Sequence, residues 1–251
     1  VWLSSHSRSW LVPNEAQNHA LRDFVALRPF IFLQHGIIQS YIGWCRRDAS
    51  NFSGFVTTVE REWRSIIESA YGYSKREVWL TGLPRFDRLY HNEKRQIVIM
   101  PTWRQYFFEK INPSTGTWIP RSGFSNTAYF NFYNSLLSHP RLLSAAKEFN
   151  YRLLFFAHPT MRLSGLADMF DCSLIEVLPG TTSYRDVYAE SDLLLSDYSS
   201  ALFDFVYLRK PILYAQFDKE EFFSGKHAVT RGYFDYERDG FGEVTYTLEE
   251  T

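Results

Sequence analysis

Short apolar runs that stop abruptly at polar residues recur along this chain, and they constrain its fold more than any other feature. Each run has the length of a buried strand. The runs and the polar residues that follow them are Phe30–Leu33 with Gln34-His35-Gly36, Ile97–Met100 with Pro101–Arg104, Leu153–Phe156 with Ala157–Pro159, and Leu193–Leu195 with Ser196–Ser200. Helical periodicity lies between several of them, over residues 53–71 and 126–149. Strands that alternate with helices predict an α/β fold with parallel sheets.

Two domains are expected from the chain's organisation. A polar run from His91 to Gln96 lies between two apolar runs and suggests a boundary, so that residues 1–90 end one α/β domain and residues 91–251 form most of a second. The sequence lacks an initiating methionine and starts inside an apparent strand, so the N-terminal domain is expected to be incomplete. Residues 105–125 show no clear period and contain proline and glycine, which predicts a long loop that serves as a lid or a wall, or else is disordered.

The composition excludes several classes of protein. The 251 residues include 27 basic and 28 acidic ones, a balance that predicts no nucleic-acid partner. No apolar run reaches the length of about 18 residues that a membrane span needs. The two cysteines lack metal-binding spacing, and the dinucleotide, Walker, zinc-protease and nucleophile-elbow motifs are absent, as is a paired-aspartate motif. No metal or cofactor is therefore predicted.

The polar turn after Leu195 is the clearest candidate for an anion site. Carboxyl ends of parallel strands share one edge, where ligands bind, so the polar clusters should gather there. Ser199 and Ser200 open a predicted helix, whose first N–H groups favour anions, and their hydroxyls could bind phosphate or simply cap the helix. Asp197 could bind a sugar hydroxyl, orient a histidine or cap the helix. Arg104 and Arg162 follow strand ends and suit phosphate, although surface ion pairs are an alternative.

Two histidines could transfer protons. His35 and His158 directly follow strongly apolar runs, and each could act as a base or stabilise a phosphate, or could be a structural hydrogen-bonding group. The remaining histidines in polar or helical surroundings are expected at the surface; they are His19, His91, His139 and His227. The residues by themselves therefore predict an interdomain cleft for a phosphate or diphosphate ligand, with a histidine available as base.

A series of motifs resembles, in order, the CDP-glycerol glycerophosphotransferase family of bacterial teichoic-acid and capsule polymerases. They are FLQHGI (32–37), LTGLPRFDRL (80–89), IVIMPTWR (97–104), FFAHP (155–159), SDLLLSDYSSALFDFVYLRKPILY (191–214) and RGYFDYERDGFG (231–242). The resemblance implies a GT-B-like fold of two Rossmann-like domains facing a cleft, with the acceptor side first and the nucleotide-donor side second. It also implies transfer of glycerol phosphate or ribitol phosphate from the CDP-linked donor to a hydroxyl of a polyol-phosphate or saccharide chain, with release of CMP. Such proteins act in the cytoplasm, peripherally at the inner membrane face, on acceptors that are expected to be lipid-linked.

The resemblance also implies roles for individual residues. It makes His35 the general base and places His158 next to the diphosphate. The donor-binding turn comprises Asp197, Ser199 and Ser200, and Arg104 matches the arginine of the Pro-Thr-Trp-Arg run; Arg162 is added from its placement alone. Where typical members have Thr-Pro and then lysines after the His-Gly pair, this chain has Ile37–Ser40, a departure that concerns acceptor contacts and donor identity.

Two other functions remain compatible with the sequence. One is a GT-B glycosyltransferase that uses a nucleotide sugar. The other is a non-catalytic domain that binds the polymer.

Overall fold

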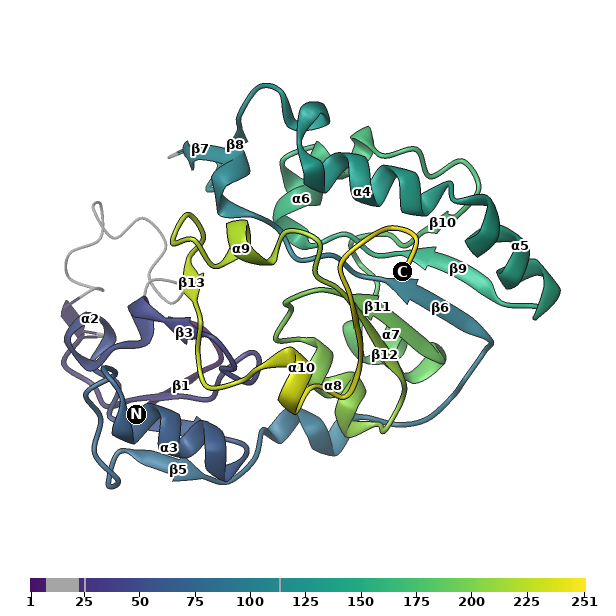
Figure 1. Cartoon of the computed structure of the whole chain (residues 1–251). Coiled ribbons are helices and arrows are strands. Elements are labelled where there is room, and N and C mark those ends of the chain that lie inside the picture. Colours follow the sequence, from purple (N-terminus) through teal and green to yellow (C-terminus); the bar gives the residue numbers. More distant parts are fainter. Residues whose placement is uncertain (8–22, 25, 113) are drawn as a thin grey trace. The chain divides into compact units, whose positions relative to one another are not determined.

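The chain consists of two compact α/β units in the computed structural model, which describes residues 1–7, 23–24, 26–112 and 114–251 (Figure 1). Unit 1 comprises Val1–Arg88 and Ala228–Phe234, and unit 2 comprises Leu89–His227 and Asp235–Thr251. The division near residue 90 lies where the polar run suggests a boundary. The segment 228–234 differs from the expected division, because it leaves unit 2 and joins unit 1.

Unit 1 is built on a four-stranded parallel sheet with the order β1-β2-β4-β5. Its strands are β1 (Trp2–Ser4), β2 (Phe30–Phe32), β4 (Gly54–Thr57) and β5 (Val78–Leu80). Stacked rings fill the core; Phe32 and Phe52, for example, have centroids 4.7 Å apart. The expectation of one helix over residues 53–71 is wrong at its start. Residues of β4 are buried at every position between β2 and β5, and the helix α3 spans only Glu60–Glu68.

A second, two-stranded pairing explains why segment 228–234 belongs to unit 1. Strand β3 (Tyr41–Ile42) pairs antiparallel with β13 (Val229–Thr230), with Val229 opposite Ile42. The other short elements of unit 1 are η2 (Gly43–Cys45), α2 (Arg47–Ser50) and η3 (Pro84–Arg88).

Unit 2 is built on a six-stranded parallel sheet with the order β10-β9-β6-β11-β12-β14. The strands are β6 (Gln96–Ile99), β9 (Arg152–Phe155), β10 (Glu176–Val177), β11 (Leu193–Ser196), β12 (Ile212–Ala215) and β14 (Gly242–Thr245). Starting at β6, the chain first adds β9 and β10 on one side of that strand. It then adds β11, β12 and β14 on the other side. This is the doubly wound order in which a topological switch point, the usual ligand position, lies between the first and fourth strands. The prediction of parallel α/β sheets is confirmed.

Helices cover the sheet of unit 2 and bury its apolar runs. They are α4 (Ala128–Leu137), α5 (Pro140–Glu148), α6 (Pro159–Leu163), α7 (Tyr184–Glu190), α8 (Leu202–Tyr207), α9 (Lys219–Phe222) and α10 (Tyr236–Asp239), with the 3-10 turns η4 (Gln105–Phe107), η5 (Phe124–Asn126) and η6 (Leu166–Met169). Ile99, Phe155 and Leu195 of three strands share one core cluster with Tyr133 and Leu137 of α4. The periodic stretch 126–149 contains two consecutive helices, since α4 ends at Leu137 and α5 begins at Pro140.

The stretch 105–125 is not the long loop that the sequence predicts. Strands β7 (Phe108–Ile111) and β8 (Trp118–Pro120) form a small antiparallel hairpin. Its aromatic residues follow no regular period, yet Phe108 and Trp118 pack on each other across the two strands, with ring centroids 5.9 Å apart. Among the described residues, no helix combines the length and apolar character that crossing a membrane requires.

Candidate active site

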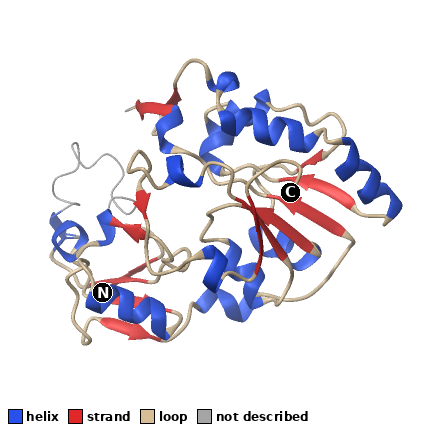
Figure 2. Cartoon of the chain, viewed as in Figure 1, coloured by secondary structure: helices blue, strands red, loops and turns tan. Residues whose placement is uncertain are grey.

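The predicted polar clusters of unit 2 gather at its topological switch point. Strands β9, β6 and β11 are neighbours in register, with Leu154, Val98 and Leu194 side by side. Their carboxyl ends therefore deliver His158, the 101–104 turn and the 197–200 turn to one edge of the sheet. Figure 2 shows these strands side by side, with loops leaving their ends. The prediction that the clusters share an edge is confirmed for these three strands.

Asp197 connects the turn that follows β6 to the turn that follows β11 through buried contacts. Its fully buried carboxylate accepts hydrogen bonds from Thr102 N at 3.0 and 3.2 Å, Tyr198 N at 2.6 Å and Tyr133 Oη at 3.2 Å. It also forms an ion pair with Arg104 at 2.9 Å. A carboxylate offers about four lone-pair positions. Asp197 thus supports the turn from inside the unit, and its predicted role in binding the donor stays a prediction.

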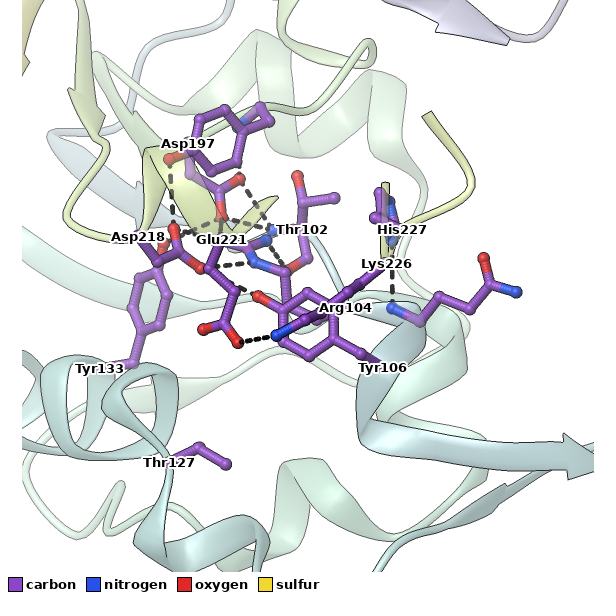
Figure 3. A network of polar contacts seen from close by, with 12 residues as sticks. Thr102, Arg104, Tyr106, Thr127, Tyr133, Asp197, Asp218, Glu221, Lys226 and His227 are labelled. Atoms are coloured by element: carbon purple, nitrogen blue, oxygen red, sulfur yellow. Dashed lines mark hydrogen bonds and ion pairs between the residues drawn. The ribbon is translucent and has the colours of Figure 1, made fainter. Parts of the chain in front are cut away.

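Arg104 occupies an enclosed position, and its predicted contact with a phosphate stays a prediction. Its side chain has 0% exposure, and Asp218 binds it through two contacts, Nε to Oδ2 at 2.8 Å and Nη2 to Oδ1 at 3.0 Å. Burial alone would lower the pKa of Arg104, but the charges of Asp197 and Asp218 outweigh burial and hold it well above the ordinary value. Figure 3 shows the guanidinium beside the carboxylates of Asp197 and Asp218. Its carbon also lies over the ring of Phe222, 4.7 Å from the ring centre. Arg104 is therefore a brace between loops.

The two serines remain at the edge, where they are partly buried. Ser199 Oγ accepts a hydrogen bond from Ala201 N at 3.2 Å, directly ahead of α8. This capping contact uses one acceptor position of the hydroxyl and leaves its O–H to be donated to a ligand oxygen. The two roles that the sequence suggests for Ser199 are thus compatible. Ser200 lies beside it in the same turn.

His158 begins α6 and has a defined tautomer when neutral. Its Nδ1 accepts a hydrogen bond from Thr160 N at 3.2 Å, so the ring hydrogen lies on Nε2. The imidazole stacks on Trp103, with centroids 5.9 Å apart and an interplanar angle of 19°. The neutral His158 therefore has its N–H donor at Nε2. The contacts with Thr160 and Trp103 fix the orientation of the ring.

His227 also belongs to this site. The sequence predicts His227 at the surface, and that prediction is wrong. It is 9% exposed, and its Nδ1 accepts a hydrogen bond from Gln105 N at 3.0 Å. Burial, with the charges of Arg104 and His158, lowers the pKa of His227 to about 3. The ring meets Trp103 edge-on at 5.4 Å, so this one tryptophan contacts both histidines. Nothing in the local Gly-Lys-His-Ala sequence signals this burial.

Two polar atoms near this edge are buried without a hydrogen-bond partner in the described part of the chain. They are Thr102 Oγ1 and Arg162 Nη1. The guanidinium of Arg162 lies over the ring of Phe156 at 5.1 Å and close to Gly180, where an added Cβ would be 2.9 Å from Nη1. Leaving such groups unpaired costs free energy that a ligand oxygen can recover. The predicted phosphate role of Arg162 stays a prediction.

His35 follows β2 at the carboxyl end of the sheet in unit 1. Its Nδ1 donates a hydrogen bond to Ser5 O at 3.0 Å, which leaves the Nε2 lone pair as the proton acceptor. Although part of the ring is exposed, the atoms packed around it lower the pKa of His35 below its ordinary value. The hydrogen bond to Ser5 opposes this shift, and the charges of His6 and Arg85 add to it. The imidazole is thus neutral near pH 7, as a general base must be.

A buried carboxylate holds the turn that carries His35. Glu62 of α3 has 0% exposure and accepts hydrogen bonds from Ile38 N and Thr58 N, both at 2.7 Å. Gln34, which precedes His35, has a left-handed φ of 63° and donates its side-chain amide to Val56 O. The sequence did not single out Glu62, because a glutamate in the first turn of an amphipathic helix is ordinary.

No group of three or more histidine, cysteine, aspartate or glutamate side chains is placed to hold a metal ion within the described residues.

Known proteins similar to this chain agree on one family. A family model described as CDP-Glycerol:Poly(glycerophosphate) glycerophosphotransferase matches residues 44–251. The minor teichoic acid biosynthesis protein GgaB of Bacillus subtilis (strain 168) is 34% identical over 245 residues, covering 96% of this chain and 26% of GgaB. The ribitol-phosphate polymerase TarL of Staphylococcus aureus (strain NCTC 8325 / PS 47) is 24% identical over 191 residues, covering 72% of this chain and 31% of TarL.

Solved structures show the same fold. The wall teichoic acid polymerase TagF matches with a TM-score of 0.57 and 16% identity, covering 89% of this chain and 57% of that one. A variant of TagF soaked with CDPG matches with a TM-score of 0.62 over 99% of this chain and 60% of that one. The chain spans about a quarter to a third of the length of the curated relatives. Its two parallel α/β units are GT-B-like, and the match over residues 44–251 places the chain in the CDP-glycerol:poly(glycerophosphate) glycerophosphotransferase family.

Proposed function

We propose that this chain transfers glycerol phosphate, or a related polyol phosphate, from CDP-glycerol to a hydroxyl of a growing teichoic acid or capsule polymer and releases CMP. Unit 2 binds the nucleotide donor, and unit 1 serves the acceptor. The observation that carries the proposal is the convergence of His158, Ser199 and Ser200 at the switch point of a doubly wound sheet, in a chain of this family. The unpaired Thr102 Oγ1 and Arg162 Nη1 support an anionic ligand there.

The chemistry follows from the protonation states of the side chains. His35 Nε2 takes the proton of the acceptor hydroxyl, whose oxygen attacks the phosphorus nearest glycerol. The new P–O bond forms as the P–O bond to CMP breaks, and CMP leaves with the electron pair. His158 Nε2 donates a hydrogen bond to a phosphate oxygen, with Ser199 and Ser200 as further donors. A positioned base of this kind is worth about two to four orders of magnitude in rate.

Arg104 and Asp197 act in this proposal as positioning residues. Together with Asp218 they hold the ends of β6, β11 and β12 in one arrangement from beneath the edge. Neither side chain has exposed surface with which to touch a donor.

The decisive assay identifies the nucleotide that is released. The protein is incubated with CDP-glycerol, CDP-ribitol and a panel of nucleotide sugars, each with a polyol-phosphate acceptor. CMP from a CDP-polyol is the expected product. Release of UDP from a UDP-sugar without any CMP would establish a glycosyltransferase instead.

A matched pair of variants separates catalysis from binding. His35→Ala should abolish turnover and leave the affinity for CDP-glycerol within a few-fold of wild type. His91→Ala is the control, because His91 is an exposed histidine that pairs with Glu93. Wild-type protein that binds polymer but turns over no donor would support the non-catalytic alternative.

We further propose that the acceptor is lipid-linked and that the protein works peripherally at the cytoplasmic face of the bacterial membrane. The names of its relatives support teichoic acid as the polymer to which the acceptor belongs. Co-sedimentation with vesicles that carry a lipid-linked acceptor, against vesicles without it, tests it; equal binding to both would count against a lipid-linked acceptor.

A further inference from the structure

A groove of about 480 Å³ in unit 1 is lined mainly by arginine and tyrosine side chains. One wall is a face of α3, on which residues three and four apart lie together. The other wall is the segment that follows β13, and Tyr41 of β3 also lines the groove. The lining side chains that matter here are Tyr41, Arg61, Arg64, Glu68, Arg231 and Tyr233.

The wall that follows β13 is fixed in place by its backbone. Gly232 approaches the main chain so closely that an added Cβ would lie 2.3 Å from Gln39 O. Phe234 N donates a hydrogen bond to the same oxygen at 3.4 Å, and β13 is paired with β3 just before. The groove is therefore formed before any ligand arrives.

Arg61 joins the two walls. Its Nη2 donates a hydrogen bond to Tyr233 O at 3.4 Å, and its guanidinium carbon lies 5.7 Å from the centre of the Tyr233 ring. This contact orders the guanidinium at the groove while the residue stays exposed to solvent.

The charge of the lining favours an anion. Among the lining side chains, three carry a guanidinium group (Arg61, Arg64 and Arg231) and one carries a carboxylate (Glu68). Arg64 also pairs with Glu60 at 2.6 Å, but its side chain keeps 58% exposure and can reach a ligand. The guanidinium fork matches phosphate oxygens in a bidentate geometry, and tyrosine rings cover the carbon chain between phosphates.

The groove lies close to the proposed base along the chain. Tyr41 follows His35 by six residues, so the two Cα atoms are at most about 22 Å apart even if the chain between them were fully extended.

We propose that this groove binds phosphodiester groups of the acceptor chain, upstream of the hydroxyl that reacts. The identity of the polymer rests on the proposed function. The anionic phosphodiester chemistry of the ligand rests on the groove alone. The head group of an anionic phospholipid carries the same phosphodiester and is the other source of such a ligand.

The test measures binding directly, by calorimetric titration of the protein with a synthetic glycerol-phosphate oligomer of defined length. Arg61→Gln with Arg231→Gln should weaken binding at least tenfold, since two charge-assisted contacts are lost. Glu68→Gln should tighten binding a few-fold by removing the opposing charge. Arg46→Gln, which removes an exposed guanidinium of unit 1 that pairs with Asp48 outside the groove, should leave the affinity unchanged. Circular dichroism and thermal unfolding verify that each variant is folded.

A second arm separates the two sources of phosphodiester. Vesicles of phosphatidylglycerol are compared with vesicles of phosphatidylcholine, for wild type and for the double arginine variant. The variant should lose oligomer binding and keep its vesicle binding. If it loses binding to phosphatidylglycerol vesicles and keeps its oligomer affinity, the groove serves a lipid surface and the proposal is wrong.

Different results would refute the groove proposal and the proposed function. CDP-glycerol affinity and CMP release are measured on the same variants. Unchanged oligomer affinity in the double variant overturns the groove proposal, even where CMP is released. Absence of CMP release together with loss of oligomer binding in the variant overturns the proposed reaction and supports the groove.

Discussion

Replacing Arg104 by methionine tests whether this residue is a brace or a phosphate ligand. Methionine keeps much of the side-chain volume and removes the guanidinium from a position with 0% exposure. Asp197 and Asp218 are then left as buried carboxylates without their shared cation.

Removing one partner of a buried ion pair costs about 3–5 kcal/mol, and one guanidinium serves two carboxylates here. We therefore expect Arg104→Met to lower the free energy of unfolding by about 5 kcal/mol. At an m-value near 2.5 kcal/mol/M this lowers the urea midpoint by roughly 2 M.

The assay is urea unfolding followed by tryptophan fluorescence. Arg152→Met is the control, because Arg152 pairs with Glu176 at the surface with 55% and 48% exposure, where loss of a pair costs less than about 1 kcal/mol. Adding Asp218→Asn to Arg104→Met should recover part of the stability by removing one uncompensated charge. If Arg104→Met unfolds like wild type but binds CDP-glycerol weakly, the brace is refuted and the arginine is a donor ligand.

Three further perturbations have expected outcomes. Because the unfolded chain protonates His227 near pH 6.5 and the folded one only near pH 3, wild type should lose about 2 kcal/mol between pH 8 and pH 5; His227→Gln should remove that slope in urea unfolding across pH. Glu62→Gln should lower kcat about tenfold at unchanged KM for CDP-glycerol, because it loosens the turn that carries the base; a changed KM with normal kcat would contradict a positioning role. Gly242→Ala should destabilise the protein by about 3 kcal/mol or more, because its Cβ would lie 1.7 Å from Ile212 O; thermal unfolding should show almost no change for Gly43→Ala, where nothing lies within 4 Å.

The sheets and their carboxyl edge could be predicted from the sequence because that information is local. A strand buried on both faces is written as a continuous apolar run, and the residues after the run must leave the sheet at its edge. Leu193–Leu195 and Leu153–Phe156 predicted β11 and β9 in this way, and with them the positions of Ser199 and His158. Residues 54–57 were wrongly predicted as helical, because Val56 fits both a buried strand and the periodicity of the helix after it.

The supporting contacts could not be predicted, because they join distant parts of the chain. Arg104 meets Asp197 and Asp218 at separations of 93 and 114 residues. A Pro-Thr-Trp-Arg run looks the same whether its guanidinium faces solvent or two carboxylates. His227 is buried by Trp103, which is distant in the sequence, and by Phe222, which is near in the sequence but gives no sign of the burial.

The pairing of β13 with β3 makes unit 1 discontinuous in the sequence. A protein cut after Arg88 would leave the backbone groups of Tyr41 and Ile42 without their ladder partners, and the exposed edge would invite aggregation. Exchange of unit 2 between members of the family therefore cannot use a single crossover point. A chimera would have to import residues 89–227 and 235–251 as two pieces and keep 228–234 from the recipient.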